Sequence, residues 1–292
     1  MDTMQTVAYM EQLRKKCNTY SLFSGIGVGV MMIGYIMADA SGDLSGMLIG
    51  FLAMIAMGVF AVMSSKEKKQ LKMVYKNTFV GNVLNQYFTN VQFNWEHGYS
   101  EDAVTNIGLT RWGNRFKSED YIRGVYKGVA FSQSDVVVKH VVRSGKNTHT
   151  YTYFEGRMFE FDCPKTDYMS TVLFSKSFGY KGKGGKFNYQ KVNMESVGFN
   201  KDFDIKAVRP HDAFYILTPQ MMECITSLYY NYGNVAMHYA FGKLYLAINM
   251  KGNAFDPVMS RPIVYAQEVQ KIRQDTEVIC RLIDCLELSP IQ

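Results

Sequence analysis

The feature that most constrains this chain is a pair of uncharged apolar runs near its N-terminus. The first covers residues 22–38 and the second residues 47–63, and neither contains Asp, Glu, Lys or Arg. With the flanking Tyr and Ser residues, each approaches the roughly 20 residues that a helix needs to cross a bilayer. The polar stretch DASGDLSG, residues 39–46, separates them and predicts a tight turn. The pattern predicts a transmembrane helical hairpin over residues 20–65.

Basic residues at the outer ends of this hairpin predict its orientation. Arg14, Lys15 and Lys16 precede the first run, Lys66, Lys68, Lys69 and Lys72 follow the second, and the turn has no basic residue. By the positive-inside rule, both termini are expected in the cytoplasm, in a multi-pass protein of the cell inner membrane. Two alternatives are the buried hairpin of a soluble protein and a cleaved signal peptide.

Glycines recur at four-residue spacing in and around the two runs. They are Gly25 and Gly29, followed by Gly42, Gly46 and Gly50. Small residues at this spacing line one face of a helix and let two helix backbones approach closely. We expect this face to pack the two helices of the hairpin together, with a dimer interface as the alternative.

Composition limits the protein classes that remain. The chain has 292 residues, of which 47% are hydrophobic and 20% charged, as in an ordinary globular protein. Its net charge of +6 comes partly from lysines beside the apolar runs, which favours a membrane surface over nucleic acid as the partner. Five cysteines without CxxC spacing indicate neither a disulfide framework nor a zinc site, and we expect reduced thiols in a cytosolic domain.

The rest of the chain predicts a helix and then a strand-rich domain. We divide it into an N-terminal segment (1–19), the hairpin (20–65), a juxtamembrane helix (66–89) and a cytoplasmic domain (90–292). Ser100, followed by Glu101 and Asp102, predicts a helix N-cap. Residues 118–162 are rich in β-branched and aromatic residues and are interrupted by the turn sequence SGKN, residues 144–147.

Further strands are expected within residues 170–178, 191–208 and 213–218. Thr218 and Pro219 predict the start of a helix over residues 220–232, because Thr caps and Pro suits the first turn. A hairpin turning at FGK, residues 241–243, and a final amphipathic helix over residues 269–286 follow. These elements predict an α+β fold: a transmembrane hairpin followed by a cytoplasmic domain with an antiparallel sheet and several helices.

The stretch GYKGKGGKF, residues 179–187, raises the question of phosphate binding. A phosphate-binding loop of the Walker type needs G-x-x-x-x-G-K followed by Ser or Thr. Here Tyr180 replaces the first Gly and Phe187 the hydroxyl residue. We therefore interpret the stretch as a mobile connection between antiparallel strands. Its lysines remain candidates for contact with anions or lipid, together with those after the hairpin: Lys181, Lys183 and Lys186, and Lys66, Lys68 and Lys69.

No catalytic residue is predicted. The histidines His97, His140, His149, His211 and His238 are far apart in sequence and form no ligand pair, so neither a metal nor another cofactor is expected. Ser100 lies in a sequence that begins like a nucleophile elbow but lacks the closing Gly. We regard enzymatic activity as uncertain and lean against it.

Three short stretches resemble a known family. They are F-x-G-R (Phe154–Arg157), E-S-x-x-F-N-K-x-F (Glu195–Phe203) and L-T-P (Leu217–Pro219). In this order they resemble a bacterial membrane-associated family catalogued as domain of unknown function 3137, over residues 99–249. The resemblance implies an upstream membrane hairpin and a LemA-type membrane protein as context, and no catalytic residue. Within these stretches, Arg157 is expected either to pair with Glu195 or to bind an anionic ligand.

The sequence thus predicts a membrane-anchored cytoplasmic interaction or scaffold module that works with other envelope proteins. Its alternative is a module that binds anionic lipid of the inner leaflet or a small anion. An uncharacterised hydrolase or transferase is a third hypothesis.

Overall fold

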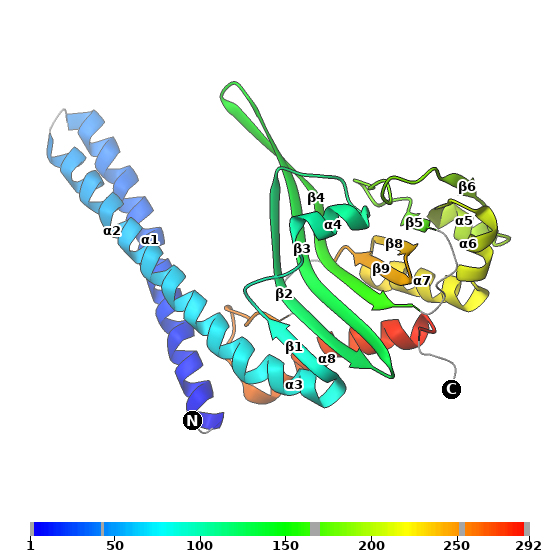
Figure 1. The fold of residues 1–292 in the computed structure, drawn as a ribbon. Coiled ribbons are helices and arrows are strands. Elements are labelled where there is room, and N and C mark those ends of the chain that lie inside the picture. Colours follow the sequence, from blue (N-terminus) through cyan, green and yellow to red (C-terminus); the bar gives the residue numbers. More distant parts are fainter. Residues whose placement is uncertain (1–2, 42–43, 164–169, 251–254, 289–292) are drawn as a thin grey trace. The chain divides into compact units, whose positions relative to one another are not determined.

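The computed structural model describes residues 3–41, 44–163, 170–250 and 255–288 (Figure 1). The predicted turn at 39–46 therefore falls partly outside the described residues, at 42–43. The chain divides into two compact units. The first comprises Met1–Asn82 with Phe255–Arg273, and the second Val83–Ala254 with Gln274–Gln292.

The first unit contains two long helices and a π-helical segment. Helix α1 (Thr3–Ser41) is followed by α2 (Leu44–Tyr75), by the π-helix Lys76–Val80 and by α3 (Gly81–Tyr87), which passes into the second unit. Among the residues that the structure describes, two helices are long and apolar enough to cross a membrane. Leu22, Ile36, Leu52 and Val62 are all more than half exposed on them. Two apolar helices of this kind suggest membrane association.

Glycines bring the backbones of α1 and α2 into contact. A Cβ atom on Gly46 would lie 2.6 Å from the nitrogen of Ala38 and 2.7 Å from the oxygen of Gly34. A Cβ on Gly34 would similarly lie 2.8 Å from the nitrogen of Gly50. Gly25 and Gly29 have no such neighbour within 4 Å. The hairpin thus uses Gly34, Gly46 and Gly50 for the close approach that small residues permit.

A segment from the C-terminal part of the chain packs within the first unit. Asp256 accepts an ion pair from Lys72 and, at 2.8 Å, from the buried Lys76. The hydroxyl of Tyr75 donates to Glu268 at 2.7 Å. Buried charges of this kind need such partners, because an unpaired charge is costly to remove from water.

The second unit is built on one antiparallel sheet. Within the described residues it has nine strands in the order β1-β2-β3-β4-β9-β8-β5-β7-β6, and every neighbouring pair is antiparallel. The strands are β1 (Thr89–Asn94), β2 (Arg115–Tyr126), β3 (Val129–Ser144), β4 (Asn147–Asp162), β5 (Thr171–Ser175), β6 (Gln190–Val192), β7 (Phe203–Ala207), β8 (Val235–Ala240) and β9 (Lys243–Ile248). The helices are α4 (Glu101–Ile107), α5 (Val197–Asp202), α6 (Pro210–Ile216), α7 (Pro219–Tyr232) and α8 (Tyr265–Cys285), which begins in the first unit. The predicted α+β class is confirmed.

Helices pack on both faces of this sheet. On one face, Phe154 and Met158 of β4 form a core cluster with Val104 and Ile107 of α4. On the other face, Arg157 of β4 reaches Asp275 in the second half of α8. Because successive side chains of a strand point to opposite faces, Arg157 and Met158 lie in different layers.

Local sequence signals predict many of these elements correctly. Ser100 and Thr218 cap α4 and α7 by accepting hydrogen bonds from the backbone N–H groups of Ala103 and Met221. The turns at 144–147 and 241–243 close the β3–β4 and β8–β9 hairpins.

Two expected strand regions are helical instead. Residues 213–218 belong largely to α6, which has Pro210 at its start and Asp212 in its first turn. Its buried Ala213 and Ile216 are three residues apart, as on a helix. Residues 197–202 form α5, where Ser196 accepts a hydrogen bond from the backbone N–H of Phe199. In both cases a helix start overrides a β-like composition.

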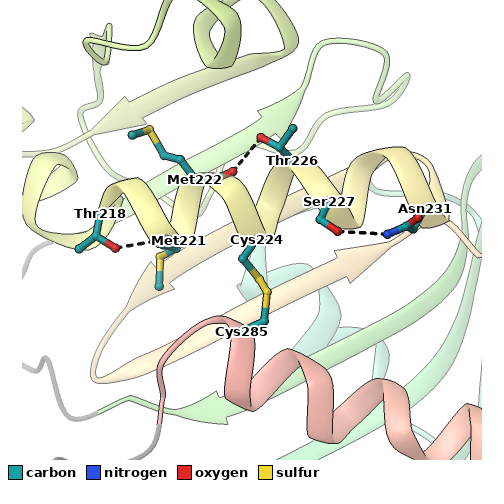
Figure 2. The surroundings of a disulfide bond; sticks show 8 residues. All are labelled: Thr218, Met221, Met222, Cys224, Thr226, Ser227, Asn231 and Cys285. Atoms are coloured by element: carbon teal, nitrogen blue, oxygen red, sulfur yellow. Dashed lines mark hydrogen bonds between the residues drawn. A yellow bond between two sulfur atoms is a disulfide. The ribbon is translucent and has the colours of Figure 1, made fainter.

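The expectation that all cysteines are reduced thiols is wrong in this structure. Figure 2 shows Cys224 of α7 bonded to Cys285 at the end of α8. Their Cα atoms are 5.7 Å apart, within the usual range for a disulfide. The other three cysteines, Cys17, Cys163 and Cys280, are free and buried. A separation of 61 residues hides this pair from any local sequence pattern.

Candidate functional site

The Gly- and Lys-rich stretch is docked on the chain just after α4. The backbone N–H of Gly182 donates to the oxygen of Leu109 at 3.1 Å, and that of Gly184 donates to Gly108 at 2.9 Å. The N–H of Arg111 donates to Tyr180 at 3.1 Å. Residues 179–187 connect two strands as expected, but these strands, β5 and β6, both pair antiparallel with β7 and therefore run in the same direction. The backbone hydrogen bonds hold this connection against residues 108–111.

Glycine is needed at the closest point of this contact. A Cβ atom on Gly182 would lie 2.0 Å from the carbonyl oxygen of Gly108. Gly108 itself has a φ of 72° and ends α4 in the left-handed conformation. The glycines thus serve backbone approach and helix termination. The same ladder occupies the N–H groups of Gly182 and Gly184, so these cannot bind a phosphate.

A chain of buried and half-buried polar groups fastens the same stretch to the sheet. The Tyr189 hydroxyl donates to the Gly184 oxygen at 2.5 Å and contacts the Ser170 hydroxyl at 2.5 Å. Ser170 lies 2.7 Å from Nε2 of His238, whose Nδ1 lies 2.7 Å from the Ile107 oxygen. Since a carbonyl oxygen only accepts, Nδ1 has the proton, and in the neutral imidazole Nε2 accepts from Ser170.

The Ser170–His238 contact resembles a nucleophile beside its base, but burial supports a structural role. Both residues are almost completely buried, and the Tyr189 hydroxyl oxygen lies 2.5 Å from the same Ser oxygen. Burial lowers the pKa of His238, which its hydrogen bond to Ile107 opposes only in part. The neutral ring is therefore favoured, and we interpret the group as an anchor for the stretch.

A cleft opens between this stretch, the chain after α4 and the tip of the β8–β9 hairpin. Its volume is about 1010 Å³. We call it the glycine-lysine cleft. The lining residues are Thr105, Asn106, Gly108, Thr110, Arg111, Trp112, Gly179, Tyr180, Lys181, Gly182, Lys183, Gly185, Lys186, Phe187 and Phe241.

The charge of the cleft is entirely positive. Arg111, Lys181, Lys183 and Lys186 line it, and none of the lining residues just named is Asp or Glu. Lys181 is engaged in a 2.6 Å ion pair with Asp204, which keeps the pKa of that carboxyl below its ordinary value. For the other three cations, no salt bridge to a carboxylate is found within the described parts of the chain. They leave the cleft suited to an anion.

Exposed aromatic residues provide the second property of the cleft. Trp112 is 59% exposed, Phe187 37% and Phe241 80%, and the rings of Phe187 and Phe241 have centroids 5.8 Å apart. Phe241 has a φ of 55° at the tip of its hairpin. A bulky residue in the left-handed region is unfavourable for the fold, and Asn or Gly would suit this turn better.

The sequence did not predict the aromatic half of this site. Arg111, Trp112, Phe187 and Phe241 come from three separated segments, and no pattern links them before the chain folds. Two features of the sequence could have indicated the site. One is the adjacent Arg111 and Trp112, and the other is a Phe in a hairpin turn that favours Asn or Gly.

Arg157 does not meet Glu195. It contacts Asp135, its cross-strand neighbour on β3, at 3.5 Å and Asp275 of α8 at 3.0 Å. Glu195 is exposed in the connection between β6 and α5. Strand order explains the difference, because β4 lies beside β3 and β9, whereas β6 forms the far edge of the sheet. The buried Arg157 is thus part of the packing between sheet and helix.

The six candidate lysines fall into two groups. Lys66, Lys68 and Lys69 are exposed on α2 in the first unit. Lys181, Lys183 and Lys186 line the glycine-lysine cleft of the second unit. Among the residues that the structure describes, no group of three or more His, Cys, Asp or Glu side chains is arranged to hold a metal ion.

Comparison with solved structures finds the crystal structure of the mycobacterial trehalose monomycolate transport factor A, TtfA. It has a TM-score of 0.37 and 8% sequence identity, and the similarity covers 73% of this chain and 96% of that one. Similarity at this level establishes neither a shared fold nor a shared function. No protein with a curated description matches the chain in sequence. Residues 152–288 match the family described as Protein of unknown function (DUF3137), and this segment, from β4 to the end of α8, is a domain of unknown function of that family.

Proposed function

We propose that this protein is a membrane-anchored interaction module that binds an anionic partner in the glycine-lysine cleft. In this proposal residues 20–65 span the membrane and residues 90–292 form the binding domain. Residues 66–89 link these two parts. The observation that supports it most directly is the lining of the cleft, which combines four cations and three exposed aromatic residues with no carboxylate. Exposed aromatic and Arg side chains are typical of binding surfaces.

The anchor is supported by the two apolar helices and by their lysine flanks. The positive-inside rule favours a cytoplasmic binding domain. The Cys224–Cys285 bond favours an oxidising compartment instead, because disulfides are rare in the cytosol. We propose the cytoplasmic orientation on the lysines. It is tested by placing a cysteine at Lys146, which is exposed at the β3–β4 tip. An impermeant thiol reagent should label this cysteine only after the cells are permeabilised. Labelling in intact cells would show that the domain lies on the opposite side of the membrane.

Binding in the cleft is tested by site-specific photo-crosslinking in native membranes. A photoreactive phenylalanine at position 241 should capture a discrete species, whether protein or lipid, that mass spectrometry identifies. The same probe at Tyr151, exposed on β4 outside the cleft, is the control. Combined replacement Lys183→Glu and Lys186→Glu should abolish capture at position 241. Identical capture at both positions, or capture indifferent to the charge reversal, would contradict the proposal.

A further inference from the structure

The chemistry of the glycine-lysine cleft also indicates which class of anion it accepts. Small phosphate sites in proteins commonly use backbone N–H groups at a glycine-rich turn. Here the N–H groups of Gly182, Gly184 and Arg111 are already bonded to carbonyl oxygens. These three N–H groups are therefore not available to an anion, and the charged groups that can meet one are the exposed side chains of Arg111, Lys183 and Lys186. Long, mobile side chains suit a headgroup that varies in position better than a phosphate held in one geometry.

The aromatic lining points to a ligand with an apolar part. Trp112, Phe187 and Phe241 leave much of their surface in water, although burying aromatic surface is favourable. The backbone around Trp112 is fixed, since the N–H groups of Arg111 and Asn114 bond to Tyr180 and Lys139. A volume of about 1010 Å³ also exceeds what an inorganic anion fills. The cleft thus offers cations and a rigid apolar surface side by side.

Anionic lipids combine these two properties, and the bilayer supplies them at high local concentration. In the proposed function, residues 66–89 link the membrane-spanning residues 20–65 to the domain that contains the cleft. Basic side chains attract anionic headgroups, and Trp and other aromatic rings favour the interfacial region of a bilayer. Resting on the proposed function, we infer that the cleft binds a single anionic phospholipid, with its headgroup on Arg111, Lys183 and Lys186 and its acyl chains against Trp112, Phe187 and Phe241.

The test uses the full chain in a neutral detergent. The chain has two tryptophans, so Trp95→Phe leaves Trp112 as the fluorescent probe in the cleft. The probes titrated are dihexanoyl phosphatidylglycerol, dihexanoyl phosphatidylcholine, inorganic phosphate and a glutamate-rich peptide. We expect a saturable change with phosphatidylglycerol and none with phosphatidylcholine or phosphate at equal concentration.

Two variants connect binding to the cleft. Lys183→Glu with Lys186→Glu should weaken phosphatidylglycerol binding by about tenfold or more, because two charges that attract the headgroup are replaced by two that repel it. Phe241→Ser should weaken it without creating a response to phosphate. Lys146→Glu, an equivalent charge change at the β3–β4 tip, should leave binding unchanged. All four positions are exposed, so the substitutions are compatible with folding.

The other outcomes would each exclude an anionic phospholipid as the ligand of the cleft, and each would indicate a different alternative. Saturation by inorganic phosphate with equal affinity would identify a free-anion site. A response to the glutamate-rich peptide alone would identify a protein-binding cleft, and the proposed function would survive without its lipid ligand. If none of the titrated compounds changes the fluorescence of Trp112, the inference is wrong. It is also wrong if Lys146→Glu weakens binding as much as the cleft variants do. Crosslinking from position 241 then decides separately whether the cleft has another partner.

Discussion

Gly182 and Gly108 approach each other so closely that a Cβ atom on Gly182 would lie 2.0 Å from the Gly108 carbonyl oxygen. The two glycines belong to segments far apart in sequence, the stretch 179–187 and the end of α4. The backbone hydrogen bonds of Gly182 to Leu109 and of Gly184 to Gly108 flank this contact. The contact therefore fixes the wall of the glycine-lysine cleft.

Replacement of Gly182 by Ala should disrupt this wall. No L-residue fits a Cβ so near a backbone oxygen, and the ladder has to shift. We expect the free energy of unfolding of the second unit to fall by about 2–4 kcal/mol. Urea unfolding followed by the fluorescence of Trp95 and Trp112 measures this change. Gly179→Ala is the matched control, since a Cβ there meets nothing within 4 Å. Equal stability of the two variants would show that the hydrogen-bonded ladder shifts to accommodate the Cβ atom at little cost in free energy.

The His238 anchor predicts a dependence of stability on pH. Burial lowers the pKa of His238 in the folded protein, whereas in the unfolded chain it is near 6.5. Between these two pKa values the unfolded state binds more protons, so the free energy of unfolding rises with pH. The stability that the neutral His238 contributes is therefore present above the pKa of the unfolded chain and is lost as pH falls below it. Urea unfolding at several pH values should show this decline below about pH 6.5.

The His238→Gln variant isolates that effect. Its unfolding free energy should change less between acidic and neutral pH than that of the unmodified protein, whatever its stability at one pH. His149→Gln, on the exposed part of β4, should retain the full dependence. If the unfolding free energy of His238→Gln depends on pH as steeply as that of the unmodified protein, other groups are responsible for the loss of stability at acidic pH.

The buried Arg157 should be important for stability. Replacing it with Met leaves Asp135 buried without its cross-strand partner, and such a loss costs about 3–5 kcal/mol of unfolding free energy. Lys127→Met breaks a 2.7 Å pair with Asp284 in which both side chains are about half exposed to solvent, and it should cost far less than the loss of Arg157, because water screens an exposed pair. Urea unfolding compares the two. A similar, small cost for both would mean that Arg157 is readily replaced.

The disulfide between α7 and α8 should also stabilise the second unit. Reduction should lower the unfolding free energy by about 2–4 kcal/mol, because the bond restricts the unfolded chain. A variant with Cys224→Ser and Cys285→Ser should start from the lower stability and should not respond to the reductant. Alkylation of the denatured, unreduced protein should modify the three free cysteines, Cys17, Cys163 and Cys280. Modification of all five cysteines of the chain would show that the bond does not form.

Several features could be predicted from the sequence because their causes lie within a few neighbouring residues. Ser100 and Thr218 cap helices through the backbone N–H three residues later, and the turn residues at 144–147 and 241–243 close hairpins. The uncharged runs 22–38 and 47–63 similarly predict two long apolar helices from composition alone. In residues 197–202 and 213–218, β-like composition misled the prediction, although Ser196 and Pro210 were signals of a helix start.

Only the tertiary structure decided which distant residues meet. Strand order brings Arg157 to Asp135 and Asp275 and keeps Glu195 away, and helix packing brings Cys224 to Cys285. The glycine-lysine cleft likewise joins residues 105–112, 179–187 and 241. The lysines and glycines of GYKGKGGKF were visible in the sequence, but the carbonyl groups that the glycines approach and the aromatic rings beside the lysines were not. Such contacts depend on the arrangement of the whole sheet, for which no short stretch of sequence contains the information.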